Sequence, residues 1–148
     1  MDVDLIKEVA SLFYQAINLD IEFAMTSSHY ENMLTFFLEV LKQIDSEEMN
    51  YQINTVFTQI IHSMTLKFRR SEQAQSLFTN SLHYLIFGLL LQLTKKHAHR
   101  CLSPISTTLR DLTIWCSTHS DPSLVTSSLQ FALNSTFVST SILDPCSV

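Results

Sequence analysis

The sequence predicts an all-α protein, because apolar residues recur at helical spacing, cap signals separate them, and turn-forming residues are rare. The 148 residues include 1 Gly and 3 Pro, too few for the hairpin turns and phosphate-binding loops that need positive φ or close backbone approach. Apolar residues make up 46% and charged residues 16% of the chain, against about 25% charged in ordinary soluble domains. A helical core is expected, buried by one chain or shared with a second subunit.

The first helix is expected to begin at Asp2 or Asp4 as its N-cap and to run to Ile17. Its apolar stripe includes Leu5 and continues at spacings of three and four residues. Residues 18–27 show no clear pattern. The sequence therefore predicts this helix and the face that it buries, and it predicts no helix or strand for the segment that follows.

A second helix is expected from the capping box Ser28-His29-Tyr30-Glu31 to near Asp45. The segment 45–48, Asp-Ser-Glu-Glu, repeats that box and begins a long helix over 46–70, while Ser71 caps another over 72–98. The short joint between them predicts a long antiparallel helical hairpin of about 37 Å. The fold class is therefore all-α, a long hairpin with shorter flanking helices.

The second arm of this hairpin contains an apolar run, Leu82–Leu93, with the only glycine of the chain, Gly88. At about 1.5 Å per residue the run spans about 18 Å, short of the roughly 20 apolar residues that cross a bilayer. A helix that is apolar nearly all round needs cover on every side. We expect the run to be buried in protein, with Gly88 at a close approach of two helices.

Two shorter helices are expected near the C-terminus, because Ser103-Pro104 and Asp121-Pro122 each place a cap before a proline. They are assigned to 104–117 and 122–134. A single helical domain is expected over 1–143, followed by a loose C-terminal tail over 144–148.

Charge is distributed unevenly along the chain. Residues 1–50 hold ten acids against two bases, whereas the rest holds seven bases against four acids. The basic clusters near positions 67–70 and 95–100 are too small to follow a nucleic-acid backbone. No secretory signal is visible at the acidic N-terminus, so an intracellular setting is expected.

No catalytic or metal-binding motif is recognised. The cysteines Cys101, Cys116 and Cys146 are odd in number and irregularly spaced, which argues against a disulfide framework. His97 and Cys101 share a helix face, but no second Cys/His pair at zinc-like spacing follows. We expect no enzyme, no cofactor and no metal.

Both arms of the hairpin carry a seam with coiled-coil spacing. Tyr84, Phe87 and Leu91 are apolar on the opposite side of the second arm, and a lone hairpin cannot bury both sides. The seam is either the core of one monomer or a dimer interface in which two hairpins form a four-helix bundle. The candidate interface residues are Val56, Ile60, Met64, Leu82, Leu85 and Leu89.

Trp115 follows Leu109 and Leu112 at helical spacing, shortly before Pro122. One interpretation is that it anchors a short helix to the core. The other is that the aromatic ring and the proline form an exposed surface for a second, separate contact.

Short segments in a fixed order along nearly the whole chain carry a resemblance to a known family. They are Met1-Asp2-Val3-Asp4, Lys7-Glu8, Leu19, Phe23, Glu39-Val40-Leu41, Met64-Thr65-Leu66, Leu77, Asn80, Cys101-Leu102, Ser103-Pro104, Leu112, Trp115 and Pro122. Their order resembles the assembly domain of a hepadnavirus core (capsid) protein, and the resemblance depends on this collinearity rather than on one specific motif. The departures given below suit a distant branch of that family, such as the non-enveloped fish relatives.

The resemblance implies a homodimer that assembles into an icosahedral shell around the viral genome, in the virion and the host cytoplasm. It assigns the contact between dimers to Trp115, Pro122, Leu124 and Val125. Replacing Trp115 by Ala is then expected to abolish particles and leave dimers. RNA would be bound only by the family's arginine-rich tail, which this sequence lacks.

Two further departures from the family are clear. The first hairpin arm has no cysteine, so a covalent dimer is not expected there. Leu124 and Val125 stand where the family places an aromatic residue. The alternative function is a regulatory helical interaction module, Bcl-2-like or HEAT-like, in which one chain encloses the apolar run and a groove binds a partner helix.

Overall fold

The computed structural model describes residues 2–68, 71–119, 126–127 and 130. All regular secondary structure of the described residues is helical, and there is no strand among them. The elements are α1 Val3–Leu19, α2 Ile21–Thr26, α3 Tyr30–Gln43, α4 Glu47–His62, the π-helix η1 Ser63–Lys67, α5 Glu72–Leu93, the 3₁₀ helix η2 His99–Cys101 and α6 Leu102–His119.

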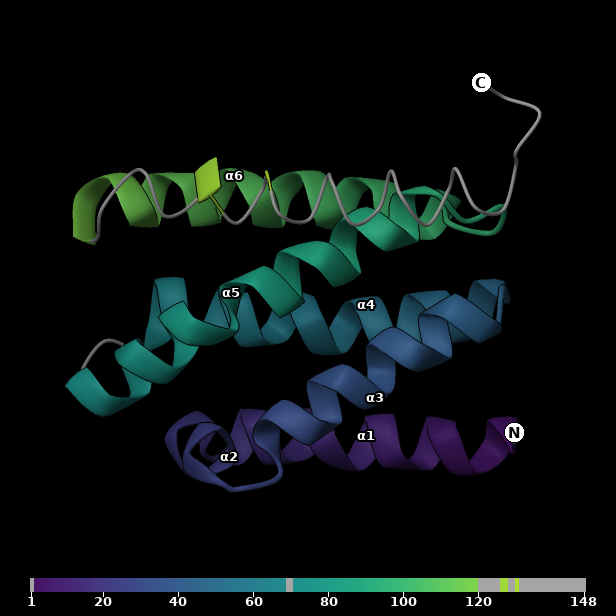
Figure 1. The fold of residues 1–148 in the computed structure, drawn as a ribbon, viewed down its shortest axis with the longest axis horizontal. Helices are drawn as coiled ribbons and strands as arrows, with labels where there is room; N and C mark the ends of the chain where they lie inside the picture. The colour runs from purple at the N-terminus through teal and green to yellow at the C-terminus, as the bar shows by residue number, and fades with distance from the viewer. Residues whose placement is uncertain (1, 69–70, 120–125, 128–129, 131–148) are drawn as a thin grey trace.

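The helices form two sets (Figure 1). In the first, α4 packs between α1 and α6, and all three run in the same direction. In the second, α3 and α5 pack on each other and cross the first set obliquely, with α2 against α5. The two arms α4 and α5 therefore contact each other, but each also packs on other helices, and they do not stand apart as a separate hairpin.

The N-cap of α1 is Asp2, as predicted. Its carboxylate accepts hydrogen bonds from the backbone N–H groups of Asp4 at 3.1 Å and Leu5 at 3.2 Å. Asp20 then ends α1 and begins α2, because its carboxylate accepts from the N–H of Phe23 at 3.1 Å. The sequence pattern left this second helix unassigned.

The capping box predicted at Ser28 is not used. The N-cap position of α3 is His29, which makes no side-chain cap hydrogen bond. The hydroxyl of Ser27 instead accepts from the N–H of His29 at 3.2 Å, in the turn that follows α2. The short α2, which ends at Thr26, shifts the turn and with it the start of the next helix.

At α4 the N-cap is Ser46, whose hydroxyl accepts from the N–H of Met49 at 3.2 Å. Asp45 has another role. Its carboxylate accepts from the side-chain amide of Asn50 at 3.0 Å and from the backbone N–H of Lys96 at 3.0 Å and of His97 at 3.4 Å. It therefore fixes residues 94–101, which we call the α5–α6 joint, against the start of α4.

The ends of both hairpin arms differ from the prediction. The first arm changes from α-helix to π-helix at Ser63, and the N–H of Phe68 bonds to the carbonyl of Ser63 at 2.6 Å. The second arm begins at the Ser71 cap as predicted, but it ends at Leu93 rather than near 98. The contacts of Asp45 explain the early end, since they hold the joint in a non-helical path.

The helix predicted from 104 begins at Leu102. Pro104 is its third residue, where a missing N–H costs nothing because the first four N–H groups of a helix have no partner within it. Most of the helix predicted over 122–134 lies outside the described residues, as do Cys146 and the tail over 144–148.

Gly88 lies where α5 packs tightly against Phe57 of α4. A Cβ atom built at this position would overlap the Phe57 ring of α4 and stand 3.2 Å from Leu38 Cδ2 of α3. The predicted close approach is therefore confirmed, and it brings three helices of one chain together around the apolar run.

By length and composition, α5 is the one described helix that could cross a membrane. Core helices of globular proteins satisfy the same criterion. Here most of its apolar side chains belong to the single cluster of buried residues formed with α1, α3, α4 and α6.

Candidate functional site

The predicted dimer seam lies inside the chain. All six of its residues are at most 1% exposed, so they offer no surface to a partner in this conformation: Val56, Ile60, Met64, Leu82, Leu85 and Leu89. The opposite side of α5 is also covered, because Phe87 and Leu91 are buried and Tyr84 donates a hydrogen bond to Glu31 of α3 at 2.8 Å. A lone hairpin was not expected to bury both sides, and here the other helices of the same chain supply the cover.

A buried polar ladder links α4 to α5 beside this seam. The amide of Asn54 donates to the side-chain oxygen of Gln92 at 3.0 Å, and the amide of Gln92 donates to the backbone carbonyl of Asn50 at 2.7 Å. Buried polar groups without partners are costly, so these bonds specify one register between the two helices. The ladder ends at Asn50, whose amide also donates to the carbonyl of His97 in the joint at 3.1 Å.

Trp115, assigned to the contact between dimers, is buried. Its ring packs edge-on against Phe78 of α5, with the ring centroids 5.4 Å apart. This geometry supports the interpretation of Trp115 as the anchor of α6 to the core. The other three residues of that set, Pro122, Leu124 and Val125, lie outside the described residues.

The largest exposed apolar side chains cluster on α1 and α2. Leu5, Leu12 and Leu19 recur every seven residues along one side of α1, and Phe23 of α2 follows. These four, which we call the outer apolar face, are between 58% and 87% exposed. Leu5 was expected in the core, but α1 packs on α4 through the adjacent stripe of Ile6, Ala10, Phe13 and Ile17.

Acidic residues border the outer apolar face. Residues 2–26 contain five acids and one base. That base, Lys7, forms an ion pair with Glu48 of α4 at 2.8 Å. Glu8, by contrast, is exposed and has no ion pair in the described part of the chain. The face therefore combines exposed leucines with negative charge.

A second exposed apolar surface lies at the α5–α6 joint and contains basic residues. Leu93 and Leu102 are exposed on either side of a segment with three bases and no acid, Lys95, Lys96 and Arg100. We call Leu93, Lys96, Arg100 and Leu102 the joint surface. Arg100 lies over the Tyr51 ring at 4.1 Å and 3.8 Å from Glu47, whereas Lys96 is exposed and has no ion pair in the described residues.

The first turn of α4 separates the two surfaces. Glu48 faces α1 through Lys7, while Glu47 faces the joint, where it lies 3.4 Å from His99. In Figure 1, α1 and α2 form one edge of the molecule and the joint lies at the end where α5 meets α6. One chain therefore presents two distinct exposed surfaces in different directions.

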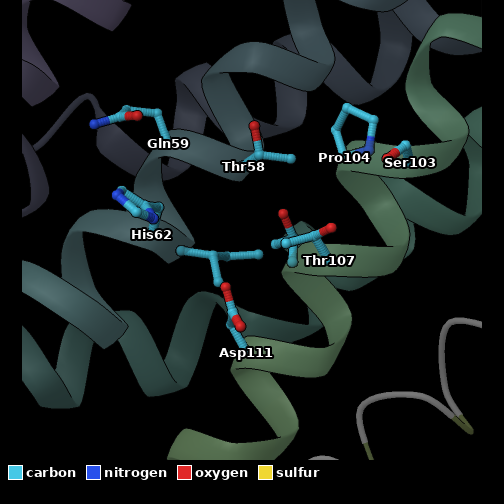
Figure 2. Close-up of a pocket in the computed structure, with 9 residues that line it drawn as sticks. Thr58, Gln59, His62, Ser103, Pro104, Thr107 and Asp111 are labelled. Atoms are coloured by element: carbon cyan, nitrogen blue, oxygen red, sulfur yellow. The ribbon is translucent and has the colours of Figure 1, made fainter.

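Figure 2 shows a cavity between α4 and α6, with a volume of about 390 Å³. Its polar lining comes from side chains of both helices, with His62 and Gln59 on one side and Thr107 and Asp111 on the other. Gln59 is already bonded to Asn18 at 2.8 Å. The cavity offers hydroxyls and single charged groups, but no hydrogen-bonded nucleophile and base.

A second, more apolar groove of about 330 Å³ runs between α1 and α4. Tyr14 and Tyr51 lie in its lining, and Glu48 is its one acidic residue. Its composition suits an apolar side chain better than a polar substrate.

The thiols of Cys101 and Cys116 are unsuited to nucleophilic chemistry. Burial raises the pKa of each to about 11, so both remain protonated near neutral pH, and the thiolate is the reactive form. Among the described residues no group of three or more His, Cys, Asp or Glu side chains is placed to hold a metal ion.

No family model, no curated protein and no solved structure matches the chain. Its function is therefore inferred from its own residues and from the resemblance described above.

Proposed function

We propose that the protein is a capsid subunit, a non-enzymatic chain that assembles with copies of itself into an icosahedral shell. The observation that carries this proposal is the presence of two separate exposed apolar surfaces on one folded chain, one beside acidic residues and one that contains basic residues. Clustered exposed apolar side chains mark interaction sites. Two surfaces that do not overlap allow each copy to bind two neighbours, the minimum for an assembly larger than a dimer.

The resemblance to hepadnavirus core proteins supports the same proposal through the order of its motifs. The shell would enclose the viral genome in the virion and form in the host cytoplasm. RNA binding would belong to a basic extension, because the described surfaces hold no basic track long enough to follow a nucleic-acid strand. Many modest contacts between copies would stabilise the shell through multivalency.

The resemblance implies a dimer in which two α4–α5 hairpins form a four-helix bundle. This dimer would require the fold to rearrange. Its six seam residues would have to leave the core of their own chain, where they are at most 1% exposed. Such a dimer would therefore form by exchange of helices between copies. Contacts through the exposed surfaces require no such rearrangement, and we favour them.

Negative-stain electron microscopy of the concentrated protein, over a series of salt concentrations, tests the proposal. Uniform hollow particles are expected. Isolated small globules under every condition would contradict a capsid role.

The alternative is a regulatory helical interaction module. One observation favours it: a single chain encloses the apolar run of α5, as that alternative expects. The groove between α1 and α4 would then hold a side chain of a partner helix. A protein that stays monomeric when concentrated would favour this module.

A further inference from the structure

We propose that copies of this chain join head to tail, with the outer apolar face of one copy on the joint surface of the next. This inference rests on the proposed function, because it names the contact through which the copies would assemble. The two surfaces belong to different parts of the chain, so the contact is heterologous and repeats from copy to copy.

The apolar part of the contact is continuous along α1. Leu5, Leu12 and Leu19 lie at intervals of seven residues, with Val9 and Ala16 between them. This 4-3-4-3 spacing places the five side chains in one seam along the helix. Val9 packs partly against the core of its own chain, and Ala16 is half-buried. The seam therefore has no complete cover within the described residues.

The charge around this seam indicates which surface binds to it. Two outer apolar faces placed together would set acids against acids, because residues 2–26 hold five acids and the base Lys7 is already paired with Glu48. An acidic lipid surface would be repelled for the same reason. The joint holds three bases between the exposed Leu93 and Leu102, and the carboxylates of Asp45 and Glu47 lie against it. Its base without an ion pair in the described residues is Lys96. A second copy thus offers both the apolar residues and the charge that the face lacks.

Reversal of charge tests this pairing. Glu8 and Lys96 are both exposed and neither has an ion pair in the described residues. Because the backbone of Lys96 is bonded to Asp45, urea denaturation first checks that each variant is as stable as the wild type. Glu8→Lys and Lys96→Glu should each weaken self-association about tenfold, because an attraction across the contact becomes a repulsion. Sedimentation velocity over a range of protein concentrations measures this effect.

Restoration is the decisive result. The variant with both reversals should associate as the wild type does, and so should an equimolar mixture of the two single variants. In the mixture each reversed surface meets its complement on the other species. Failure of both combinations to restore association, with each single variant impaired, would overturn the proposed pairing.

A matched pair of leucine variants tests the apolar part of the contact. Leu12→Glu should abolish association, whereas Leu66→Glu should leave it unchanged, since both leucines are exposed but Leu66 lies in η1, outside both surfaces. Circular dichroism confirms that each variant remains helical. Equal association of both variants with the wild type would overturn the inference.

The outcomes separate this inference from the proposed function. Hollow particles that form equally well after either charge reversal would overturn the head-to-tail contact and leave the capsid role standing. Open chains or small rings that respond to the reversals, without shells, would support the contact and contradict the capsid role. A monomer at every concentration would overturn both.

Discussion

Gly88 is required in this fold by space rather than by backbone conformation, because no residue of the described chain has a positive φ. The Phe57 ring occupies the position where a Cβ would stand, and Leu38 closes the other side. Both neighbours are buried, so neither can move into solvent. One hydrogen atom in place of a side chain therefore allows α3, α4 and α5 to meet.

Gly88→Ala should destabilise the protein by about 1–3 kcal/mol, the usual cost of overpacking a dense core. A gain of about 1 kcal/mol in helix propensity opposes part of this cost. Urea denaturation measures the difference, with Asn80→Ala on the exposed side of α5 as a control. Phe57→Leu in the Gly88→Ala background should recover part of the loss, and a stable single variant would show that the helices are less closely packed.

Trp115 was assigned to assembly, but its burial against Phe78 makes it a core residue. Trp115→Ala should cost about 3–5 kcal/mol of unfolding free energy, as for other large aromatic truncations. The neighbouring Ile114 is exposed, so Ile114→Ala should cost less than about 0.5 kcal/mol. Thermal denaturation of the two variants compares them. Equal stability of the two variants would indicate that Trp115 lies at the surface and would favour its assignment to the contact between dimers.

Asp45 makes stability depend on pH. Burial acts to raise the pKa of this carboxyl, but hydrogen bonds from Asn50, Lys96 and His97, with the charge of His97, outweigh it and lower the pKa below 3.8. A depressed pKa stabilises the folded state above the unfolded value of 3.8, and this contribution is lost as pH falls through the folded pKa. Asp45→Asn should therefore flatten the dependence of unfolding free energy on pH below about 4. An unchanged slope would contradict a stabilising role for the ionised Asp45 carboxylate at the joint.

At the level of elements, local signals predicted those helix ends whose caps act locally. Asp2 and Ser71 begin α1 and α5 as expected, because each side chain bonds only to the first turn of its own helix. Around Asp45 the prediction failed because a distant partner intervenes. Asp45 is bonded to the joint 51 residues away, which leaves Ser46 as the cap and ends α5 early.

The outer apolar face could also have been found from the sequence. Leu5, Leu12 and Leu19 repeat every seven residues, beside a second stripe that contains Ile6 and Ile17. Both stripes are apolar, and periodicity alone does not tell which one faces the core. The position of α4 decides this, and it depends on packing across the whole chain.

The buried ladder between α4 and α5 should behave as one unit. Gln92→Leu removes the partner of Asn54 and should cost about 1–3 kcal/mol, because a buried amide is left without its acceptor. The double variant Asn54→Leu, Gln92→Leu should be more stable than the sum of the single effects predicts. A double-mutant cycle by urea denaturation measures this coupling, and additive losses would show that the two side chains act independently.

At the scale of the whole molecule, the sequence was enough to predict the fold class. It was not enough to predict whether one chain or two bury the apolar run. Scarce glycine and helical spacing predict an all-α chain, which the described residues confirm. The run Leu82–Leu93 is too apolar for a surface, but composition does not say whose side chains cover it. Three contacts decide this: α3 covers one side, α4 another, and Trp115 brings α6 against Phe78 of the same helix.

A chain that buries its own core should fold without a partner, so its stability should not depend on protein concentration. For Leu12→Glu, in which the outer apolar face is disrupted, the urea midpoint should stay constant over a hundredfold range of concentration. An obligate dimer of exchanged hairpins would instead gain about 2.7 kcal/mol over the same range by mass action. Denaturation followed by far-UV circular dichroism measures the midpoint. A rising midpoint would mean that a second copy supplies part of the cover of α5, and that the six seam residues lie between subunits after all.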